Sequence, residues 1–139
     1  MIIDTSVLVA IALHEPSRDF LIAAIRAAAT PTVSSVSLLE AGIVIRSREG
    51  ELAVPKLYRF LEEAGIETAV FDAAQAKAAV GAFARFGKGM GHRAQLNFGD
   101  CAVYALAAIR GEPLLATGND FAATDLTDVG PTSDRKSVV

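Results

Sequence analysis

The chain has 139 residues, which suits one domain and is long enough to bury a substantial core. Hydrophobic residues make up 52% of it and charged residues 21%, which excludes a disordered chain, and its net charge of −3 excludes a global electrostatic attraction to nucleic acid. Its single cysteine excludes an internal disulfide or a cysteine-based zinc site, and no apolar run reaches the roughly 18 residues of a transmembrane helix.

The first half of the sequence alternates short apolar runs with stretches of helical spacing. The first run ends at Asp4, and Thr5 and Ser6 follow it as candidate helix-starting residues. The predicted elements are a strand at residues 1–3, a short helix at 5–10, a helix at 17–28, a strand at 32–34 and a helix at 35–48. On the last of these helices we expect an inward-facing apolar side made of Leu38, Leu39, Gly42, Ile43 and Ile45.

The second half continues the alternation and contains one irregular stretch. The predicted elements are a helix at 54–64, a strand at 67–70, a helix from the cap Asp72 through Phe86, the irregular stretch at 87–97, a helix at 98–110, a strand at 113–116, a turn or helix at 119–122 and a strand at 126–129. On the helix that ends at Phe86 we expect burial of Ala74, Ala78, Val80, Phe83 and Ala84. Cys101 falls within an apolar pattern, which indicates a buried, unreactive thiol.

Strands that alternate with helices predict an α/β fold with a parallel sheet and right-handed crossovers. The sequence contains no internal repeat or linker, so we expect a single domain over residues 1–130 and a flexible C-terminal tail over 131–139. The N-terminal apolar run has no basic leader, which argues against a secretion signal, and the lone cysteine suits a reducing compartment. We therefore expect a cytoplasmic protein.

Four polar residues recur where predicted strands end or the following helices begin, and they are Asp4, Glu40, Asp100 and Asn119. In a parallel sheet these places meet at the carboxyl edge, where ligands bind in such folds. Glu40 and Asp100 stand among apolar neighbours, where a carboxylate is costly to bury unless it is paired or bound to a cation. The alternative is a set of helix caps, because Ser37-x-x-Glu40 matches a capping box and Asn97-x-x-Asp100 resembles one.

Convergence of three carboxylates indicates a bound divalent cation, because their charges would otherwise repel one another. Oxygen ligands alone favour Mg²⁺ or Mn²⁺ over zinc, and no cysteine cluster or histidine pair competes for the role. A carboxylate-held Mg²⁺ with open coordination positions suits phosphodiester hydrolysis, since it can activate water and neutralise charge on the phosphate.

Four sequence motifs stand in order along nearly the whole chain: Ile2-Ile3-Asp4-Thr5-Ser6, Ser37-Leu38-Leu39-Glu40, Leu96-Asn97-Phe98-Gly99-Asp100-Cys101 and Leu114-Leu115-Ala116-Thr117-Gly118-Asn119-Asp120-Phe121. Together they resemble the motifs of PIN-domain ribonucleases, specifically the VapC toxins of bacterial type II toxin–antitoxin pairs. The resemblance implies a three-layer α/β/α sandwich around a central, mainly parallel sheet of four to five short strands.

The resemblance further implies a Mg²⁺-dependent endoribonuclease toxin, with Mn²⁺ as a substitute ion, that hydrolyses structured RNA such as tRNA or ribosomal RNA. It also implies a homodimer and inhibition by a cognate VapB-like antitoxin. The catalytic residues of the family map onto Asp4, Glu40, Asp100 and Ser6, and its metal ligands onto Asp4, Asp100, Glu40 and, more weakly, Asn119. Asn119 brings an amide where the family has a fourth acid, and Asp120 is the neighbouring carboxylate.

The glycine-rich stretch at 87–97 carries Lys88, His92 and Arg93, which we expect to bind RNA phosphates, with a plain surface loop as the alternative. The stretch lacks the Gly-Lys-Ser/Thr ending of a phosphate-binding loop and follows a helix instead of a strand, which argues against nucleotide binding. A general-base role for His92 is the weaker interpretation, because a bound metal can lower the pKa of its own water.

Two other functions remain as alternatives. A non-catalytic binding module would keep the PIN fold without nuclease activity, as the amide of Asn119 suggests. A metal phosphatase or phosphoacceptor domain would need a second acid close to Asp4, which the following Thr5-Ser6-Val7 does not supply. The apolar residues at 43–45 and 57–61 are consistent either with core packing or with a surface for an antitoxin helix or a second copy.

Overall fold

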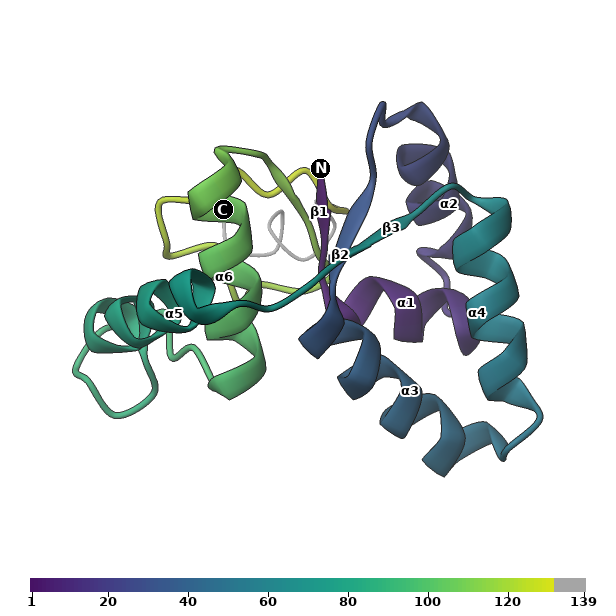
Figure 1. Cartoon of the computed structure of the whole chain (residues 1–139), viewed down its shortest axis with the longest axis horizontal. Coiled ribbons are helices and arrows are strands. Elements are labelled where there is room, and N and C mark those ends of the chain that lie inside the picture. Colours follow the sequence, from purple (N-terminus) through teal and green to yellow (C-terminus); the bar gives the residue numbers. More distant parts are fainter. Residues whose placement is uncertain (132–139) are drawn as a thin grey trace.

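The computed structural model describes residues 1–131, which form a four-stranded parallel sheet between two layers of helices (Figure 1). The strands lie in the order β3 (Glu67–Ala69), β2 (Thr32–Ser34), β1 (Ile2–Ile3) and β4 (Leu114–Leu115). One layer contains α1 (Thr5–Ala12), α2 (Arg18–Ala27), α3 (Ser35–Glu49) and α4 (Ala53–Glu63), and the other contains α5 (Ala73–Phe86) and α6 (Phe98–Arg110). The predicted three-layer α/β/α fold is confirmed.

Successive residues of the central strand β1 face opposite cores. Ile2 and Leu114 belong to the core beneath α5 and α6, whereas Ile3 and Leu115 belong to the core beneath α1 to α4. All four side chains are completely buried. Helices cover both faces of the sheet at β1 and β4, so these two strands consist of apolar residues only.

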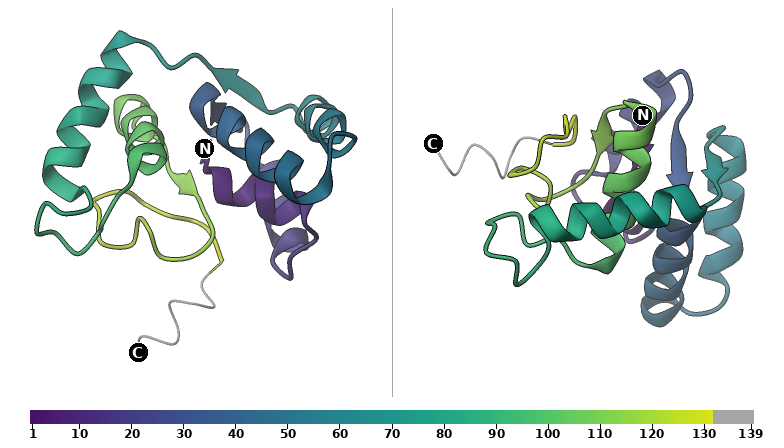
Figure 2. Two further views of the ribbon diagram at one scale, coloured as in Figure 1. Left: turned by 90° about the horizontal axis from the view of Figure 1, so that it is seen from below. Right: turned by 60° about the vertical axis from the view of Figure 1, so that its left-hand side comes forward.

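Three helices begin at the carboxyl edge of this sheet. Asp4 follows β1 and caps α1, Ser34 ends β2 and caps α3, and Asn97 caps α6. Figure 2 shows α6 beside α3 when the molecule is seen from below. Helix N-termini favour negative charge, so this edge suits carboxylates.

The strand predicted at 126–129 is not a strand. Leu114 and Asp128 form an isolated parallel bridge, in which the Leu114 N–H donates to the Thr127 carbonyl at 2.8 Å and the Val129 N–H donates to the Leu114 carbonyl at 2.8 Å. The preceding residues 119–126 fold as turns and bends, which leaves too little extended chain for a ladder. Most of the predicted tail, residues 132–139, lies outside the described residues.

The inward face predicted for α3 is largely wrong. The buried residues are Ser37, Ala41 and Ile45, whereas Leu39 is 65% exposed and Ile43 is 59% exposed. This helix carries apolar residues on two sides, so the spacing of its apolar residues does not identify the buried one.

The predicted face of α5 is wrong for the same reason. Gln75, Ala82 and Phe86 are buried there, whereas Val80 is 72% exposed. The helix is rich in alanine around its whole circumference, and only the side that packs against α6 is covered. Within residues 1–131, no helix is long and apolar enough to span a membrane.

The irregular stretch at 87–97 is a loop whose two ends are tied together. The Lys88 N–H donates to the Leu96 carbonyl at 2.9 Å, and the Leu96 N–H donates to the Phe86 carbonyl at 2.8 Å. Gly89 and Gly91 have positive φ angles of 86° and 80°, which glycine adopts without strain. The loop therefore has a defined base that fixes where α6 begins.

Candidate functional site

Asp4 is a buried carboxylate held by the residue two positions later. Its side chain is 5% exposed, and Oδ2 accepts hydrogen bonds from the Ser6 backbone N–H at 3.1 Å and from Ser6 Oγ at 2.6 Å. Ser6 Oγ in turn accepts the Thr117 N–H at 3.1 Å. Ser6 therefore joins the end of β1 to the segment that follows β4.

Glu40 reaches the same edge from α3. Its Oε1 accepts a hydrogen bond from Thr5 Oγ1 at 2.6 Å. Its Oε2 lies where a side chain on Gly99 would be, since a Cβ there would come within 2.6 Å of it. The Glu40 carboxylate therefore lies against the first turn of α6.

Asp100 forms a capping box with Asn97 at the start of α6. Its Oδ2 accepts the Asn97 N–H at 3.0 Å, and Asn97 Oδ1 accepts the Asp100 N–H at 2.9 Å. The cap interpretation is confirmed for this residue, and it does not exclude a role in a site. The box fixes the orientation of the Asp100 carboxylate at the start of α6.

Burial and, to a lesser extent, neighbouring carboxylates raise the pKa of Asp4 and of Asp100 at this edge. Burial raises the pKa of Asp4 to about 6 against the opposing hydrogen bonds from Ser6, and the charges of Glu40 and Asp120 raise it further. Burial also raises the pKa of Asp100 to about 7, opposed by the hydrogen bond from Asn97 and assisted by Asp4, Asp120 and Glu40. Asp4, Glu40, Asp100 and Asp120 therefore share one electrostatic environment.

Asp120 supplies the fourth negative charge of this environment, next to the predicted Asn119. Both Asp4 and Asp100 feel its charge. Asn119 is exposed and its carbonyl accepts the Ala122 N–H at 3.1 Å in the turn after β4. A weak metal-ligand role for Asn119 stays a prediction. The sequence pair Asn119-Asp120 was the available signal that a charged residue, Asp120, stands next to Asn119 at this edge.

The acidic edge fits a divalent cation by its chemistry. Within residues 1–131, no lysine or arginine forms an ion pair with Asp4, Glu40, Asp100 or Asp120. No three carboxylates in this part of the chain lie close enough to hold one ion as they stand, so binding would require side-chain rotation. The hydrogen bonds on Asp4 end at Oδ2, which leaves Oδ1 for a ligand.

The sequence predicts Thr5 only as a helix-starting residue and predicts no role for Gly99, although both stand inside the quoted motifs. A glycine in the first turn of a predicted helix was the available signal for Gly99, because glycine is a poor helix residue. For Thr5, the sequence offered no indication that its hydroxyl reaches Glu40 across 35 positions.

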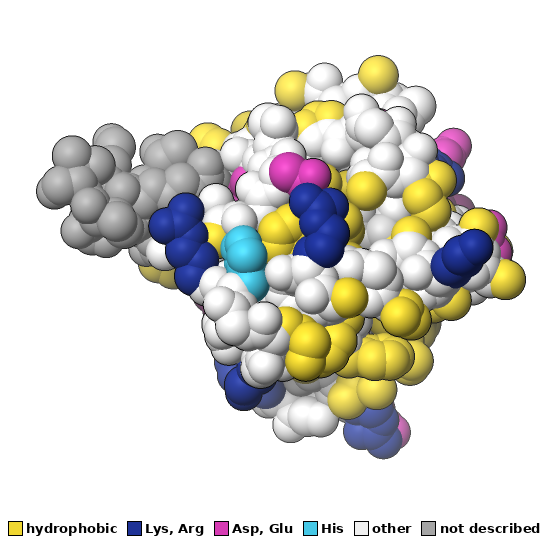
Figure 3. Space-filling model, turned by 90° about the vertical axis from the view of Figure 1, so that its left-hand side faces the viewer, with side chains coloured by type: hydrophobic (Ala, Val, Ile, Leu, Met, Phe, Trp, Pro, Cys, Tyr) yellow, Lys and Arg dark blue, Asp and Glu magenta, His cyan; other side chains and the backbone are white. Residues whose placement is uncertain are grey.

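The predicted phosphate-binding residues lie on the 87–97 loop and differ in solvent exposure and in their contacts with the rest of the protein. Lys88 and Arg93 are exposed, whereas His92 Nδ1 accepts the Ala94 N–H at 3.0 Å and its ring packs edge-on against Phe86 at 4.9 Å. Figure 3, which views the side of α5, shows basic side chains spaced apart instead of gathered in one patch. His92 is therefore engaged in the fold of the loop.

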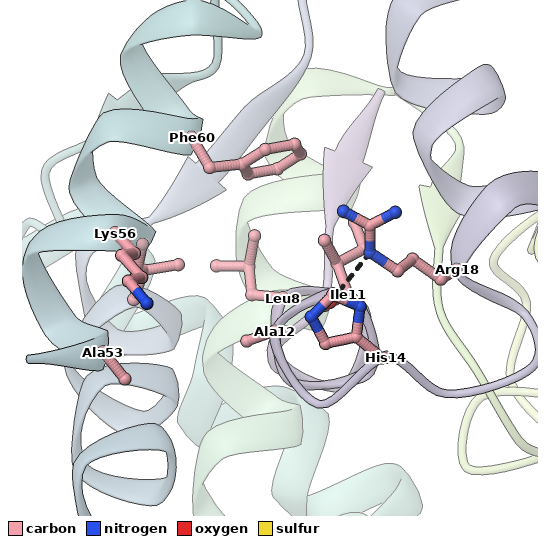
Figure 4. Close-up of a pocket in the computed structure, with 9 residues that line it drawn as sticks. Leu8, Ile11, Ala12, His14, Arg18, Ala53, Lys56 and Phe60 are labelled. Carbon is pink, nitrogen blue, oxygen red and sulfur yellow. Dashed lines mark hydrogen bonds between the residues drawn. The ribbon is translucent and has the colours of Figure 1, made fainter. Parts of the chain in front are cut away.

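A separate apolar pocket of about 220 Å³ lies between α1 and α4 (Figure 4). Its lining residues are Leu8, Ile11, Ala12, His14, Arg18, Ala53, Lys56, Leu57 and Phe60. Arg18 Nε donates to the Ile11 carbonyl at 3.2 Å, which fixes its guanidinium beside His14. The pocket thus combines an apolar floor with basic side chains at its margin.

Comparison with known sequences relates residues 1–126 to the PIN domain family. The chain is 46% identical over 129 residues to a ribonuclease VapC of Mycolicibacterium smegmatis, covering 93% of this chain and 99% of the relative. It is 44% identical over 127 residues to ribonuclease VapC36 of Mycobacterium tuberculosis, covering 91% of each.

Solved structures support the same fold. VapC20 of Mycobacterium tuberculosis, described as a sarcin–ricin loop cleaving toxin, matches with a TM-score of 0.77 at 17% identity, covering 94% of this chain and 98% of that one. VapBC2 of Rickettsia felis, bound to a promoter DNA fragment, matches with a TM-score of 0.73 at 19% identity, covering 93% and 96%. From the sequence identities and the PIN-domain match, this chain belongs to the VapC ribonuclease family of PIN-domain proteins.

Proposed function

We propose that this protein is a Mg²⁺-dependent endoribonuclease toxin that hydrolyses phosphodiester bonds in structured RNA. The observation that carries the proposal is the group of carboxylates around Asp4 and Asp100, whose pKa is raised by burial and further by the charges of the neighbouring acids. No basic partner among the described residues neutralises them, so a cation would relieve their repulsion. Family membership supplies the reaction class.

Asp4, Asp100 and Glu40, with Asp120 as the fourth acid, would hold the ion. When bound, Mg²⁺ supplies activation of water and neutralisation of charge on the phosphate. Ser6 keeps Asp4 oriented through its two hydrogen bonds, and Asn97 does the same for Asp100.

Recognition of RNA would depend on local contacts, because the net charge is −3. Exposed Lys88 and Arg93 would bind phosphates, and a sparse set of such contacts suits a folded RNA such as tRNA or ribosomal RNA, which is recognised mainly by shape. The charge of Asp120 weakens the case for a non-catalytic module, because that case depends on the missing acid at Asn119.

Replacement of the carboxylates tests the proposal. We expect Asp4→Asn and Asp100→Asn each to reduce Mg²⁺-dependent RNA cleavage by about 100-fold or more and to weaken Mn²⁺ binding in calorimetry, because each removes a ligand charge. Asp19→Asn, an exposed aspartate on α2, is the matched control and should cleave normally. Wild-type cleavage by purified Asp4→Asn protein, or undiminished wild-type cleavage in EDTA, would contradict the proposal.

The same measurements distinguish the two candidates for the fourth ligand. We expect Asp120→Asn to weaken Mn²⁺ binding more than Asn119→Ala, because only Asp120 contributes a charge that acts on Asp4 and Asp100. The reverse order would assign the fourth position to Asn119.

We further propose a cognate antitoxin and a homodimer as partners, in a cytoplasmic setting. The VapBC2 match and a toxin–antitoxin complex from Klebsiella pneumoniae, which matches with a TM-score of 0.69, support the first. Exposed apolar side chains on α3 support the second.

A further inference from the structure

Thr5 and Ser6, consecutive at the start of α1, hold two different carboxylates. Ser6 Oγ donates to Asp4 Oδ2 at 2.6 Å, and Thr5 Oγ1 donates to Glu40 Oε1 at 2.6 Å. Successive residues of a helix point about 100° apart, so one hydroxyl reaches back to the strand end while the other reaches across to α3. The helix start therefore binds one acid from β1 and one from α3.

On the side away from Thr5, the Glu40 carboxylate occupies the space that a side chain on Gly99 would fill. A Cβ at this position would lie 2.6 Å from Glu40 Oε2 and 2.8 Å from Oε1, which is closer than such atoms approach. The φ angle of Gly99 is not positive, so the backbone does not require glycine. Glycine is also a poor helix residue, and the space taken by Glu40 is what accounts for it here.

We propose that Thr5 and Gly99 are positioning residues that hold the Glu40 carboxylate at the acidic edge. This proposal rests on the proposed function, because the position of Glu40 matters for activity only if its carboxylate helps to hold the ion. Glu40 is half-buried on a helix, its long side chain is free to turn towards solvent, and the charges of Asp4 and Asp100 repel it. The hydrogen bond from Thr5 offsets that repulsion, and the missing side chain of Gly99 leaves the space that the carboxylate occupies. Metal affinity therefore depends on two residues that need not touch the ion.

Thr5→Val tests the hydrogen bond, because valine keeps the branched shape and removes the donor. We expect Mn²⁺ affinity, measured by calorimetry, and RNA cleavage to fall by about tenfold, as for other groups that orient metal ligands. Thr5→Ser keeps the hydroxyl and should restore most of both. Thr68→Val, an exposed threonine on β3, is the matched control and should change neither.

Gly99→Ala tests the space. In the wild-type background we expect the added methyl group to displace Glu40, lower Mn²⁺ affinity and give no gain in Tm. In a Glu40→Ala background the collision is gone, so the same substitution should raise Tm, because alanine is the better helix residue. Gly81→Ala on α5, where nothing lies within 4 Å of the new Cβ, should raise Tm in both backgrounds and leave Mn²⁺ binding unchanged.

The double variants separate a positioning role from a purely structural one. If Thr5 acts through Glu40, Thr5→Val adds no further loss of Mn²⁺ affinity to Glu40→Ala. An additive loss, or wild-type affinity in Thr5→Val, overturns the proposal while the proposed function stands. If the wild-type protein binds no Mn²⁺, the proposed function fails. The Tm change of Gly99→Ala in the two backgrounds then still decides whether Glu40 occupies this space: a rise of Tm in the Glu40→Ala background alone supports the proposal, and equal changes in both backgrounds overturn it.

Discussion

Asp4 and Asp100 combine a structural duty with a candidate catalytic one. Asp4 caps α1 and Asp100 completes the capping box of α6, yet burial raises the pKa of both. A cap alone would gain little from burial, because a surface carboxylate can make the same hydrogen bonds. The cost of burying these charges is therefore an indication that something besides the helix ends uses them.

The raised pKa values predict how stability changes with pH when no divalent ion is present. Between about pH 4 and pH 7 the unfolded chain loses protons that the folded chain keeps on Asp4, whose pKa is about 6, and on Asp100, whose pKa is about 7. For these groups the free energy of unfolding therefore decreases as pH rises through this window. We expect Tm in EDTA to fall from pH 5 to pH 7.5, and Mg²⁺ to raise Tm more at pH 7.5 than at pH 5, because it binds the ionised forms.

The Asp4→Asn/Asp100→Asn double variant is the control for this pH dependence. It should show a smaller fall of Tm with pH in EDTA, because the two titrating groups are gone. The same pH profile in wild type and double variant would contradict the raised pKa values as its cause.

At the scale of elements, α3 presents apolar side chains on a side that no other described element covers. Leu39 and Ile43 are exposed there, and with Tyr58 of α4 they line a shallow groove between the two helices. We propose that a second copy of the chain covers this groove, because a contiguous apolar surface on a monomer is unfavourable in water.

Ile43→Glu tests this dimer surface. A buried, unpaired charge is costly at an interface, so we expect the variant to sediment as a monomer at concentrations where the wild type sediments as a dimer. Ile109→Glu, an exposed isoleucine near the end of α6, is the matched control and should leave the association state unchanged. A wild-type monomer, or dissociation by both variants alike, would contradict the assignment.

At the scale of the whole molecule, a basic-rimmed pocket lies between α1 and α4, and none of the four acids of the acidic edge lines it. Lys56, His14 and Arg18 surround its apolar floor, so it complements a segment that combines apolar anchors with acidic residues. We propose that the cognate antitoxin binds here through such a segment.

Lys56→Glu tests the antitoxin pocket. We expect this charge reversal to weaken antitoxin binding by about tenfold at low ionic strength, with a smaller effect at high salt, because screening reduces the interaction of exposed charges. Arg59→Glu lies on the same helix outside the pocket and should change affinity far less. Equal effects of the two variants in a titration of antitoxin into toxin would show that overall charge, and not this pocket, governs binding.

The order of strands and helices was predictable from sequence because each element is local. Apolar runs, caps and glycine ends identified β1, β2 and β4, and they also gave the helix over Phe98–Arg110 with its observed bounds. The buried sides of α3 and α5 were not predictable, because both helices have more than one apolar side and only packing selects the one that faces the core. Residues 126–129 were predicted as a strand, whereas only Asp128 pairs, with Leu114. The sequence could not show this, because the turns before these residues determine how many of them can pair with β4.

The sequence by itself determined which acids lie at the carboxyl edge, because strand ends and helix starts are set locally and a parallel sheet brings them to one side. Only the tertiary structure decided which groups hold those acids. Thr5 meets Glu40 through the packing of α1 against α3, and the missing side chain of Gly99 leaves room for that carboxylate at the start of α6. These contacts join residues distant in the chain, so they depend on how the layers pack and not on the spacing of residues within any one element.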